Sequence, residues 1–143
     1  MKSKLTILCE NSVGVPFGVI GEHGFACFLE TENGNYLFDT GQGFAITQNA
    51  LALGKDLAGI RAIMISHGHY DHTGALDRML ELAPASRLYH HPGVFDRRWS
   101  LKNGKPRDIG MPLGTVDAVR ARPLQHLHCV FRPLLPLRRI GIT

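Results

Sequence analysis

The chain has 143 residues, of which 44% are hydrophobic and 20% are charged, the balance of one folded domain. This composition excludes a disordered, collagen-like or coiled-coil protein. No apolar run reaches the roughly 18 residues of a membrane span, and the apolar stretch at residues 5–9 is too short for a signal peptide. The three cysteines have no motif spacing, so we expect no disulfide framework and a cytoplasmic location.

The formal net charge of +4 is concentrated at one end of the sequence. Residues 1–119 carry 11 Lys and Arg against 12 Asp and Glu, whereas residues 120–143 carry five Arg and no acid. The body of the chain is therefore nearly neutral. A uniformly basic groove that follows phosphates is not indicated, and we expect neither nucleic acid nor membrane as a partner.

Hydrophobic patterning predicts a layered α/β domain in which strands are followed by alternating helices and strands. We expect strands at 2–10, 25–31, 36–38, 62–65 and 86–90, and helices at 43–53 and 74–82. The Asn33–Gly34 pair indicates a hairpin before the third strand, and Gly54 is suited to end the first helix. Residues 62–65 form an unbroken apolar run, as in a strand buried on both faces. The polar segment 92–113 is expected to be loop, with room for one short helix.

The last part of the chain differs in kind from the rest. Residues 120–139 contain no acid, lysine or glycine, and prolines at 123, 133 and 136 are incompatible with a continuous helix or a central strand. Arg, Pro, Leu and His dominate, as in GC-rich codons read out of frame, so our hypothesis is a frameshifted or truncated end. A flexible basic arm, or an arm that binds nucleic acid or membrane, is the alternative. We therefore divide the chain into a partial domain at 1–119 and an irregular or disordered tail at 120–143, outside the fold.

Four side chains of metal-ligand type follow the apolar run within six positions, namely His67, His69, Asp71 and His72. Imidazole nitrogen and carboxylate oxygen are the ligands that a divalent ion such as zinc prefers. Alternation at a strand end places His67 and His69 on one side, with Gly68 leaving the site open, and the turn that follows brings the other two toward the same cavity. The four side chains would hold one ion, or the two adjacent ions of a dinuclear hydrolase. A structural metal site and a polar loop with coincidental histidines are the alternatives.

This H-x-H-x-D-H motif after a buried strand, with Asp39-Thr40-Gly41 upstream, resembles the metallo-β-lactamase superfamily. The branch that the sequence resembles most is that of the 7,8-dihydropterin-6-methyl-4-(β-D-ribofuranosyl)aminobenzene-5′-phosphate synthase-like proteins, through residues 21–24, 37–41, 66–76 and 102–110. The resemblance spans about residues 1–115. It implies the N-terminal half of an αββα sandwich, with one mixed sheet and helices on one side. The other face of that sheet would be uncovered and open to self-association.

The resemblance also implies roles for individual residues. His67 and His69 would ligate a first metal, and Asp71 and His72 a second, the cofactor being one or two zinc ions, or manganese or iron. Asp71 would in addition contact the nucleophilic water, and a buried Asp39 would orient the metal loop from behind the ligands. Superfamily enzymes complete the site with two further His and one Asp from a second half of the domain, which this sequence does not contain.

A phosphate-bearing pterin is the substrate that the branch implies. The local basic cluster that would meet a phosphate comprises Arg97, Arg98, Lys102, Lys105 and Arg107. His91 ends a predicted strand at the border of the cleft, and we take His91, Arg97, Arg98 and Lys102 as candidates for substrate binding. His126 and His128 form a second H-x-H without a following acid, and we do not expect them to be ligands.

Two functional hypotheses follow from these observations. The first is a metal-dependent hydrolase in which metal-activated water attacks an ester, lactone or phosphoester of a small-molecule substrate, with Asp71 as the catalytic residue. The second is a catalytically inactive, truncated metal-binding fragment that lacks the second half of the site.

Overall fold

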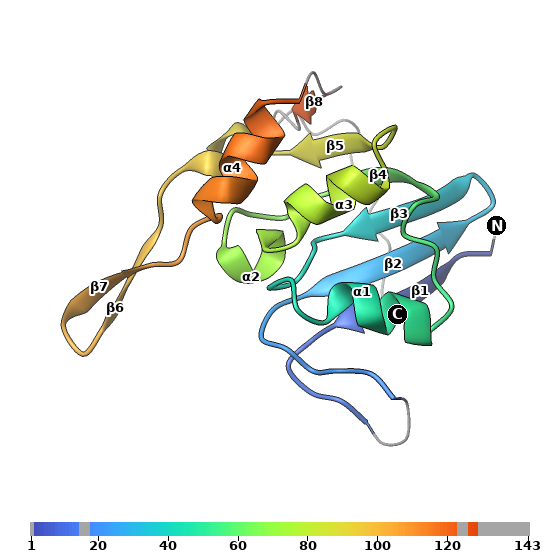
Figure 1. Ribbon diagram of the computed structural model, residues 1–143, viewed down its shortest axis with the longest axis horizontal. Coiled ribbons are helices and arrows are strands. Elements are labelled where there is room, and N and C mark those ends of the chain that lie inside the picture. The colour runs from blue at the N-terminus through green and yellow to red at the C-terminus, as the bar shows by residue number, and fades with distance from the viewer. Residues whose placement is uncertain (1, 15–17, 123–125, 129–143) are drawn as a thin grey trace, which may run out of the picture.

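The computed structural model describes residues 2–14, 18–122 and 126–128. Figure 1 shows a large sheet, helices packed on it and a hairpin that projects from the body. The strands are β1 (Lys4–Cys9), β2 (Ala26–Thr31), β3 (Gly34–Phe38), β4 (Ile60–Met64), β5 (Arg87–His90), β6 (Trp99–Lys102), β7 (Lys105–Asp108) and β8 (His126–His128). The helices are α1 (Ile46–Ala52), α2 (Tyr70–Thr73), α3 (Leu76–Leu82), α4 (Leu113–Arg120) and a 3₁₀ helix, η1 (Pro92–Phe95).

The large sheet is mixed, as the sequence predicts. Its strand order is β1-β2-β3-β4-β5-β8. β2 pairs antiparallel with both β1 and β3, and the other pairs, from β3 to β8, are parallel. Figure 1 shows α1 and α3 on the same face of this sheet. The predicted α/β class, with one mixed sheet and helices packed on it, is therefore confirmed.

The core lies between that face and the helices. Alternate strand residues point into it and are buried, namely Leu8, Phe28, Leu37, Ile63 and Leu88. They meet the apolar sides of three helices, represented by Ile46, Met79 and Val119. Burial of each such side chain contributes about 1.5–3 kcal/mol before the entropy of ordering is subtracted. Gly54 follows α1 with φ +64°, the left-handed conformation for which glycine is suited.

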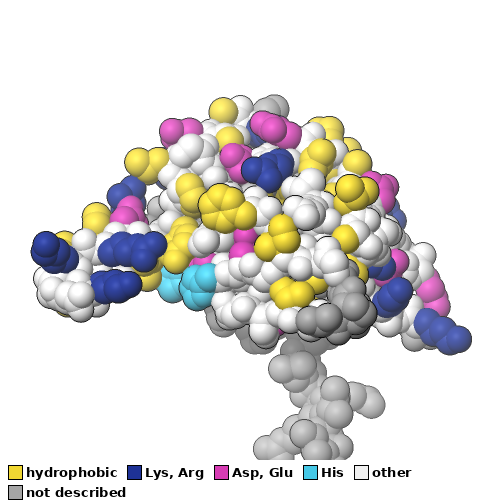
Figure 2. All heavy atoms as spheres, turned by 60° about the horizontal axis from the view of Figure 1, so that its bottom comes forward, with side chains coloured by type: hydrophobic (Ala, Val, Ile, Leu, Met, Phe, Trp, Pro, Cys, Tyr) yellow, Lys and Arg dark blue, Asp and Glu magenta, His cyan; other side chains and the backbone are white. Residues whose placement is uncertain are grey.

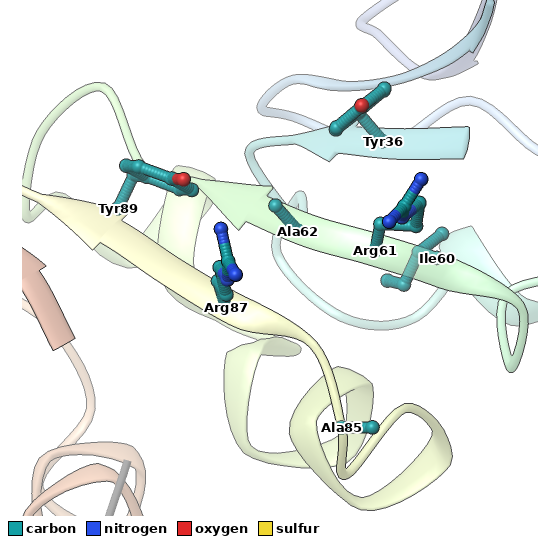
Figure 3. A pocket seen from close by; sticks show the side chains of 7 residues that line it. All are labelled: Tyr36, Ile60, Arg61, Ala62, Ala85, Arg87 and Tyr89. Atoms are coloured by element: carbon teal, nitrogen blue, oxygen red, sulfur yellow. The ribbon is translucent and has the colours of Figure 1, made fainter. Parts of the chain in front are cut away.

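The opposite face of the sheet, which we call the outer face, carries an apolar stripe across five strands. Register aligns Leu5 with Leu29, Leu29 with Tyr36, and Phe38 with Met64. These side chains are half-buried or exposed, Leu5 being 59% exposed. Figure 3 shows a pocket of about 510 Å³ on this face, where Tyr36 and Tyr89 stand near Arg61 and Arg87.

Replacing Leu29 by lysine is expected to weaken self-association through the outer face. Leu29 lies within the stripe, between Leu5 and Tyr36, where a charge opposes burial against a second copy. Sedimentation velocity over a concentration series measures the effect, and we expect the association midpoint to rise at least about tenfold, or about 1.4 kcal/mol. Leu51→Lys, at an 82% exposed position on α1, is the matched control. Equal association of wild type and both variants would rule out an interface on this face.

The segment predicted as loop at 92–113 contains regular structure, which corrects that prediction. Besides η1, residues 99–108 form the hairpin β6–β7, whose turn residues Asn103 and Gly104 have φ +53° and +73°. Positive φ at both turn positions is the geometry of a two-residue hairpin turn, for which Asn-Gly is preferred. β7 reads Lys-Pro-Arg-Asp, with no apolar alternation, and the two alternating apolar residues of β6, Trp99 and Leu101, are exposed, so strand prediction from hydrophobic patterning has little to detect.

Helix boundaries also differ from the prediction. The helix expected at 74–82 is α3, which begins at Leu76, and a separate short helix, α2, precedes Gly74 and Ala75. The helix expected from residue 43 begins at Ile46, because the backbone N–H groups of residues 42–45 donate to the side chain of Glu22 and not into a helix. α4 has no counterpart in the prediction, since Gly114, Thr115 and Val116 lower helix propensity.

Part of the predicted tail lies next to the sheet. β8 pairs in parallel with β5, with His128 opposite His90. The rest of the tail beyond Arg122 lies outside the described residues, and its separation from the domain stays a prediction. Within the described ranges, Cys9 and Cys27 are free thiols, and no helix has the length and apolarity needed to cross a bilayer.

Candidate metal centre

The chemistry-bearing residues gather at one edge of the large sheet. β3, β4 and β5 are parallel, so their carboxyl ends point the same way, and this is the edge at which open α/β sheets bind ligands. Asp39 follows β3, and the segment Ser66–His72 follows β4. The backbone of His128 reaches the same edge through its pairing with β5, a position that no pattern in the sequence predicts.

Asp39 is the buried polar centre of this edge, with only 1% of its surface exposed. One carboxylate oxygen accepts from the Ser66 backbone N–H at 2.8 Å, and the other accepts from Ser66 Oγ at 2.6 Å. That second oxygen also lies 2.8 Å from His72 Nδ1. Because a carboxylate only accepts, Nδ1 carries the proton and Nε2 of His72 is left with its lone pair. Asp39 therefore sets the tautomer of a predicted ligand without lying among the ligands.

Three imidazoles stand together above Asp39. The ring centroid of His67 is 4.5 Å from that of His69 and 4.2 Å from that of His72. His67 Nε2 lies 2.9 Å from His69 Nδ1, and His67 Nδ1 lies 2.9 Å from Ser66 Oγ. Burial, followed by the neighbouring rings of His72 and His69, lowers the pKa of His67, and this favours the neutral ring that binds metals.

Asp71 meets an imidazole that the sequence analysis did not single out as a site residue. Its Oδ2 is 3.3 Å from His23 Nε2 and 3.7 Å from His72 Nε2. His23 Nδ1 in turn lies 3.0 Å from Asn11 Oδ1. Only the family resemblance of residues 21–24 draws attention to His23. No pattern of residue types in the sequence itself indicates a functional role for it.

Whether these side chains suit a divalent ion depends on how their donor atoms are spaced. Within the described ranges, no three His, Cys, Asp or Glu side chains are arranged as a metal-binding group. They hydrogen-bond in pairs instead, with His67 to His69 and His72 to Asp39. Two nitrogens held about 2.0–2.1 Å from one zinc ion lie roughly 3.0–3.4 Å apart. The His67–His69 separation of 2.9 Å is close to that spacing, so the donor types and their proximity fit such an ion.

An open pocket of about 580 Å³ adjoins Asp71 and His72. Its other lining residues are Ile7, Glu10, Asn11, His23, Gly24 and Phe25, which combine apolar and polar groups. The role assigned to Gly68 needs correction here. A Cβ at this position would lie 1.9 Å from the Val94 carbonyl oxygen, so glycine is required for packing against η1 and not for an open site.

The predicted substrate-binding residues are dispersed. His91 accepts from Gly93 N–H at the start of η1. Arg97 pairs with Asp108, and Arg98 donates to the carbonyls of Asp96 and Gly93 at 2.8 and 2.9 Å, so both guanidinium groups have partners within the protein. Lys102 lies at the hairpin tip opposite Lys105. Figure 2 shows histidine side chains beside the Lys and Arg side chains of the projecting hairpin.

The hairpin is fastened to the histidine segment at its root. Tyr70 N–H donates to Ile109 O at 3.1 Å, and His69 forms an isolated bridge with Gly110. The Arg107 guanidinium lies 5.6 Å from the centre of the Tyr70 ring. By register, Lys102, Lys105 and Arg107 share one face of the hairpin, and we call this face the basic face.

Comparison with known proteins links this geometry to one family. A family model described as the metallo-beta-lactamase superfamily matches residues 20–136. The match continues past residue 115, where the sequence resemblance was expected to stop.

Two curated proteins of Methanocaldococcus jannaschii are similar to parts of the chain. One, an uncharacterised protein, is 35% identical over 77 residues, covering 54% of this chain and 29% of its own length. The other, a 7,8-dihydropterin-6-methyl-4-(beta-D-ribofuranosyl)-aminobenzene-5′-phosphate synthase, is 31% identical over 98 residues, covering 64% of this chain and 33% of its own. Among solved structures, the metallo-β-lactamase GOB-18 from Elizabethkingia meningoseptica is 29% identical over 50% of this chain and 27% of its own, with a TM-score of 0.45. The chain thus spans a third or less of the length of these proteins.

Proposed function

The chain belongs to the metallo-β-lactamase superfamily, and from this premise we propose that it is a metal-dependent hydrolase-like protein whose centre is the His67–His72 segment. The observation that carries the proposal is the convergence of three imidazoles, with His67 in contact with both others, behind which Asp39 holds His72. Nitrogen and carboxylate donors favour zinc, with manganese or iron as alternatives.

In this proposal each residue has a separate task. His67 and His69 would hold one ion, and Asp71 and His72 a second. Such ions would supply Lewis acidity and lower the pKa of a water molecule. Asp71 would orient that water, and Asp39 keeps His72 in the tautomer that suits metal binding. The pocket beside Asp71 and His72 offers the space in which an ester, lactone or phosphoester would lie.

The proposed substrate is a small molecule that carries a phosphate, as in a phosphorylated pterin. The similarity to the phosphate synthase of Methanocaldococcus jannaschii supports this class. The basic face of the hairpin supports it as well, because Lys102 and Lys105 form no ion pair within the described residues and Arg107 leans over Tyr70 beside His69. Arg97 and Arg98 are less suited, since their guanidinium groups are already bound.

Removing two charges from the basic face should weaken binding of a phosphorylated substrate. For the double variant Lys102→Ala and Lys105→Ala, we expect KM for a phosphate ester to rise about threefold to tenfold, with kcat and the KM for a neutral lactone unchanged. Steady-state kinetics with both substrates measures the difference. The variant Arg61→Ala and Arg87→Ala removes equal charge from the outer face and serves as the control. An equal rise in KM for both substrates would contradict a role in phosphate recognition.

Metal content and turnover, measured together, test the proposed function. The full chain is loaded with zinc or manganese, freed of excess ion by gel filtration, and assayed against a phosphodiester and a lactone. One or two ions per chain with turnover of either substrate supports the hydrolase. Absence of any retained ion would overturn it.

A second candidate is a metal-binding fragment without catalysis. The chain spans only 29% and 33% of its two curated relatives, and no three donor side chains of the described residues form a ready metal group. Retention of metal without turnover of any ester, in both metal forms, would favour this alternative.

A further inference from the structure

Glu22 makes a set of contacts that the proposed function does not use. Its Oε1 accepts from the backbone N–H groups of Gln42 and Gly43 at 2.8 and 3.1 Å. Its Oε2 accepts from those of Phe44 and Ala45 at 2.8 and 2.9 Å. Four consecutive backbone donors around one carboxylate form the type of concavity that binds anions, and here the chain fills it with its own side chain.

A fifth donor comes from the other side of the carboxylate. Cys9 Sγ lies 3.1 Å from Glu22 Oε1, and burial, followed by this contact, raises the pKa of the Cys9 thiol, so the thiol is protonated and donates. Burial alone would raise the pKa of Glu22, but the Cys9 contact and the N–H groups of residues 43–45 outweigh it and lower the pKa. Glu22 is therefore an anion with hydrogen-bond donors at both oxygens.

The loop that Glu22 binds leads directly to the proposed metal centre. Residues 42–45 continue from Asp39, Thr40 and Gly41. The Thr40 N–H and Oγ1 both donate to the His72 carbonyl, at 2.8 and 3.1 Å, and Gly74 N–H donates to the Gly41 carbonyl at 2.9 Å. The loop 39–45 thus lies between Glu22 on one side and His72 on the other.

The chain next to Glu22 approaches the second proposed ligand. Phe25 N–H donates to the Asp71 carbonyl at 3.2 Å, and Gly41 N–H donates to the Phe25 carbonyl at 2.9 Å. A Cβ at Gly24 would lie 2.1 Å from the Asp71 carbonyl oxygen, which shows how closely this segment packs against the histidine segment. Both the loop and α2 are therefore held from the Glu22 segment.

We propose that Glu22 is a positioning residue, whose carboxylate fixes the loop 39–45 and through it the orientation of Asp39 and His72. The inference rests on the proposed function for its consequence at the metal, whereas its effect on the loop does not depend on any metal. Without the carboxylate, four neighbouring backbone donors lose their common acceptor, and loop 39–45 is free to leave His72.

Two measurements on Glu22→Gly and Glu22→Gln test this role. In the metal-free full chain, hydrogen exchange of the amides at 42–45 is expected to accelerate at least about tenfold in both variants, and more in the glycine variant. In the presence of cobalt(II), the variants should show an altered ligand-field spectrum and an affinity about 10–100-fold lower. Glu81→Gln, at an exposed position on α3, is the control and should behave as wild type.

Chemical rescue separates an anionic role from general packing. Formate added to Glu22→Gly should restore amide protection and the wild-type cobalt spectrum, whereas an equal concentration of chloride should not. If the glycine variant does not fold, Glu22→Gln carries the test through the exchange and cobalt measurements. Wild-type protection at 42–45, or protection lost without any change in cobalt binding, would overturn the proposal. If instead wild type itself binds no cobalt while the amide effect appears, the proposed function fails and the role of Glu22 in the loop stands.

Discussion

Replacing His67 and His69 together by alanine is expected to abolish binding of the first proposed ion while leaving the fold intact. The two rings supply both donors of the first proposed ion, and their nitrogens face each other at 2.9 Å. Removing outer partners of a metal site costs about 10–100-fold in affinity, so loss of two direct ligands should exceed 100-fold. Metal per chain after gel filtration should fall by about one ion relative to wild type, leaving at most the ion assigned to Asp71 and His72, and hydrolysis should fall to background.

Stability should change little in this variant, because His67 is only half-buried and its hydrogen bonds are made mainly within the segment itself. We expect the free energy of unfolding to change by less than about 1 kcal/mol, measured by urea titration of the metal-free protein. His91→Ala is the control, since His91 accepts from η1 in the neighbouring loop. Wild-type metal content in the double alanine variant would show that His67 and His69 are not ligands of a bound ion.

Local features made the histidine segment predictable from the sequence. An unbroken apolar run identifies β4, and ligand side chains directly after it must lie at the carboxyl end of a buried strand, whatever the rest of the fold. The alternation of His67 and His69 needs only the geometry of extended chain. The side chains that support the segment are far less visible. Glu22 contacts Gln42, 20 positions away, and His23 reaches Asp71 across a sequence separation more than twice as long.

The β6–β7 hairpin is indicated by its turn residues, although hydrophobic patterning does not predict its strands. Asn103–Gly104 is the same pair that correctly indicates the β2–β3 hairpin at Asn33–Gly34. The earlier pair is flanked by apolar runs that pack in the core, whereas β6 and β7 project from the body and bury little on either face. Strand prediction from hydrophobic period fails for an element that has no core side. For such elements, turn chemistry is the more reliable guide.

The outer face of the sheet is a second apolar surface of this fold, opposite the core. Half-sandwich architecture is implied by resemblance alone, but the stripe from Leu5 to Tyr89 gives it a physical counterpart in this chain. Leu5 and Ile7, on the edge strand β1, are 59% and 42% exposed and extend the stripe to the edge of the sheet. A stripe of this kind favours association with another apolar surface, which is what the Leu29→Lys experiment measures.

Substitution of Asp39 separates support of the fold from support of the metal. Asp39→Ala removes the acceptor for Ser66 N–H, Ser66 Oγ and His72 Nδ1 in a buried position. Each buried donor left unpaired costs about 1–3 kcal/mol. Asp39 also has φ +56°, a conformation that Asp tolerates better than Ala. We therefore expect a loss of about 3 kcal/mol or more in unfolding free energy, measured by urea titration without metal.

Asp39→Asn should behave differently, because the amide keeps the shape of the carboxylate and an oxygen for the Ser66 N–H. Its NH₂ group, placed toward His72, favours the tautomer in which Nδ1 accepts and Nε2 carries the proton. That tautomer cannot bind a metal through Nε2, so zinc affinity should fall about 10–100-fold while stability falls by only about 1 kcal/mol. Asp56→Asn, in an exposed turn that accepts from Ala58 N–H, is the control. Wild-type zinc affinity in Asp39→Asn, measured by competition with a chelator, would mean that His72 binds no metal through Nε2. Equal stability of the alanine and asparagine variants would mean that the three hydrogen bonds do not support the loop.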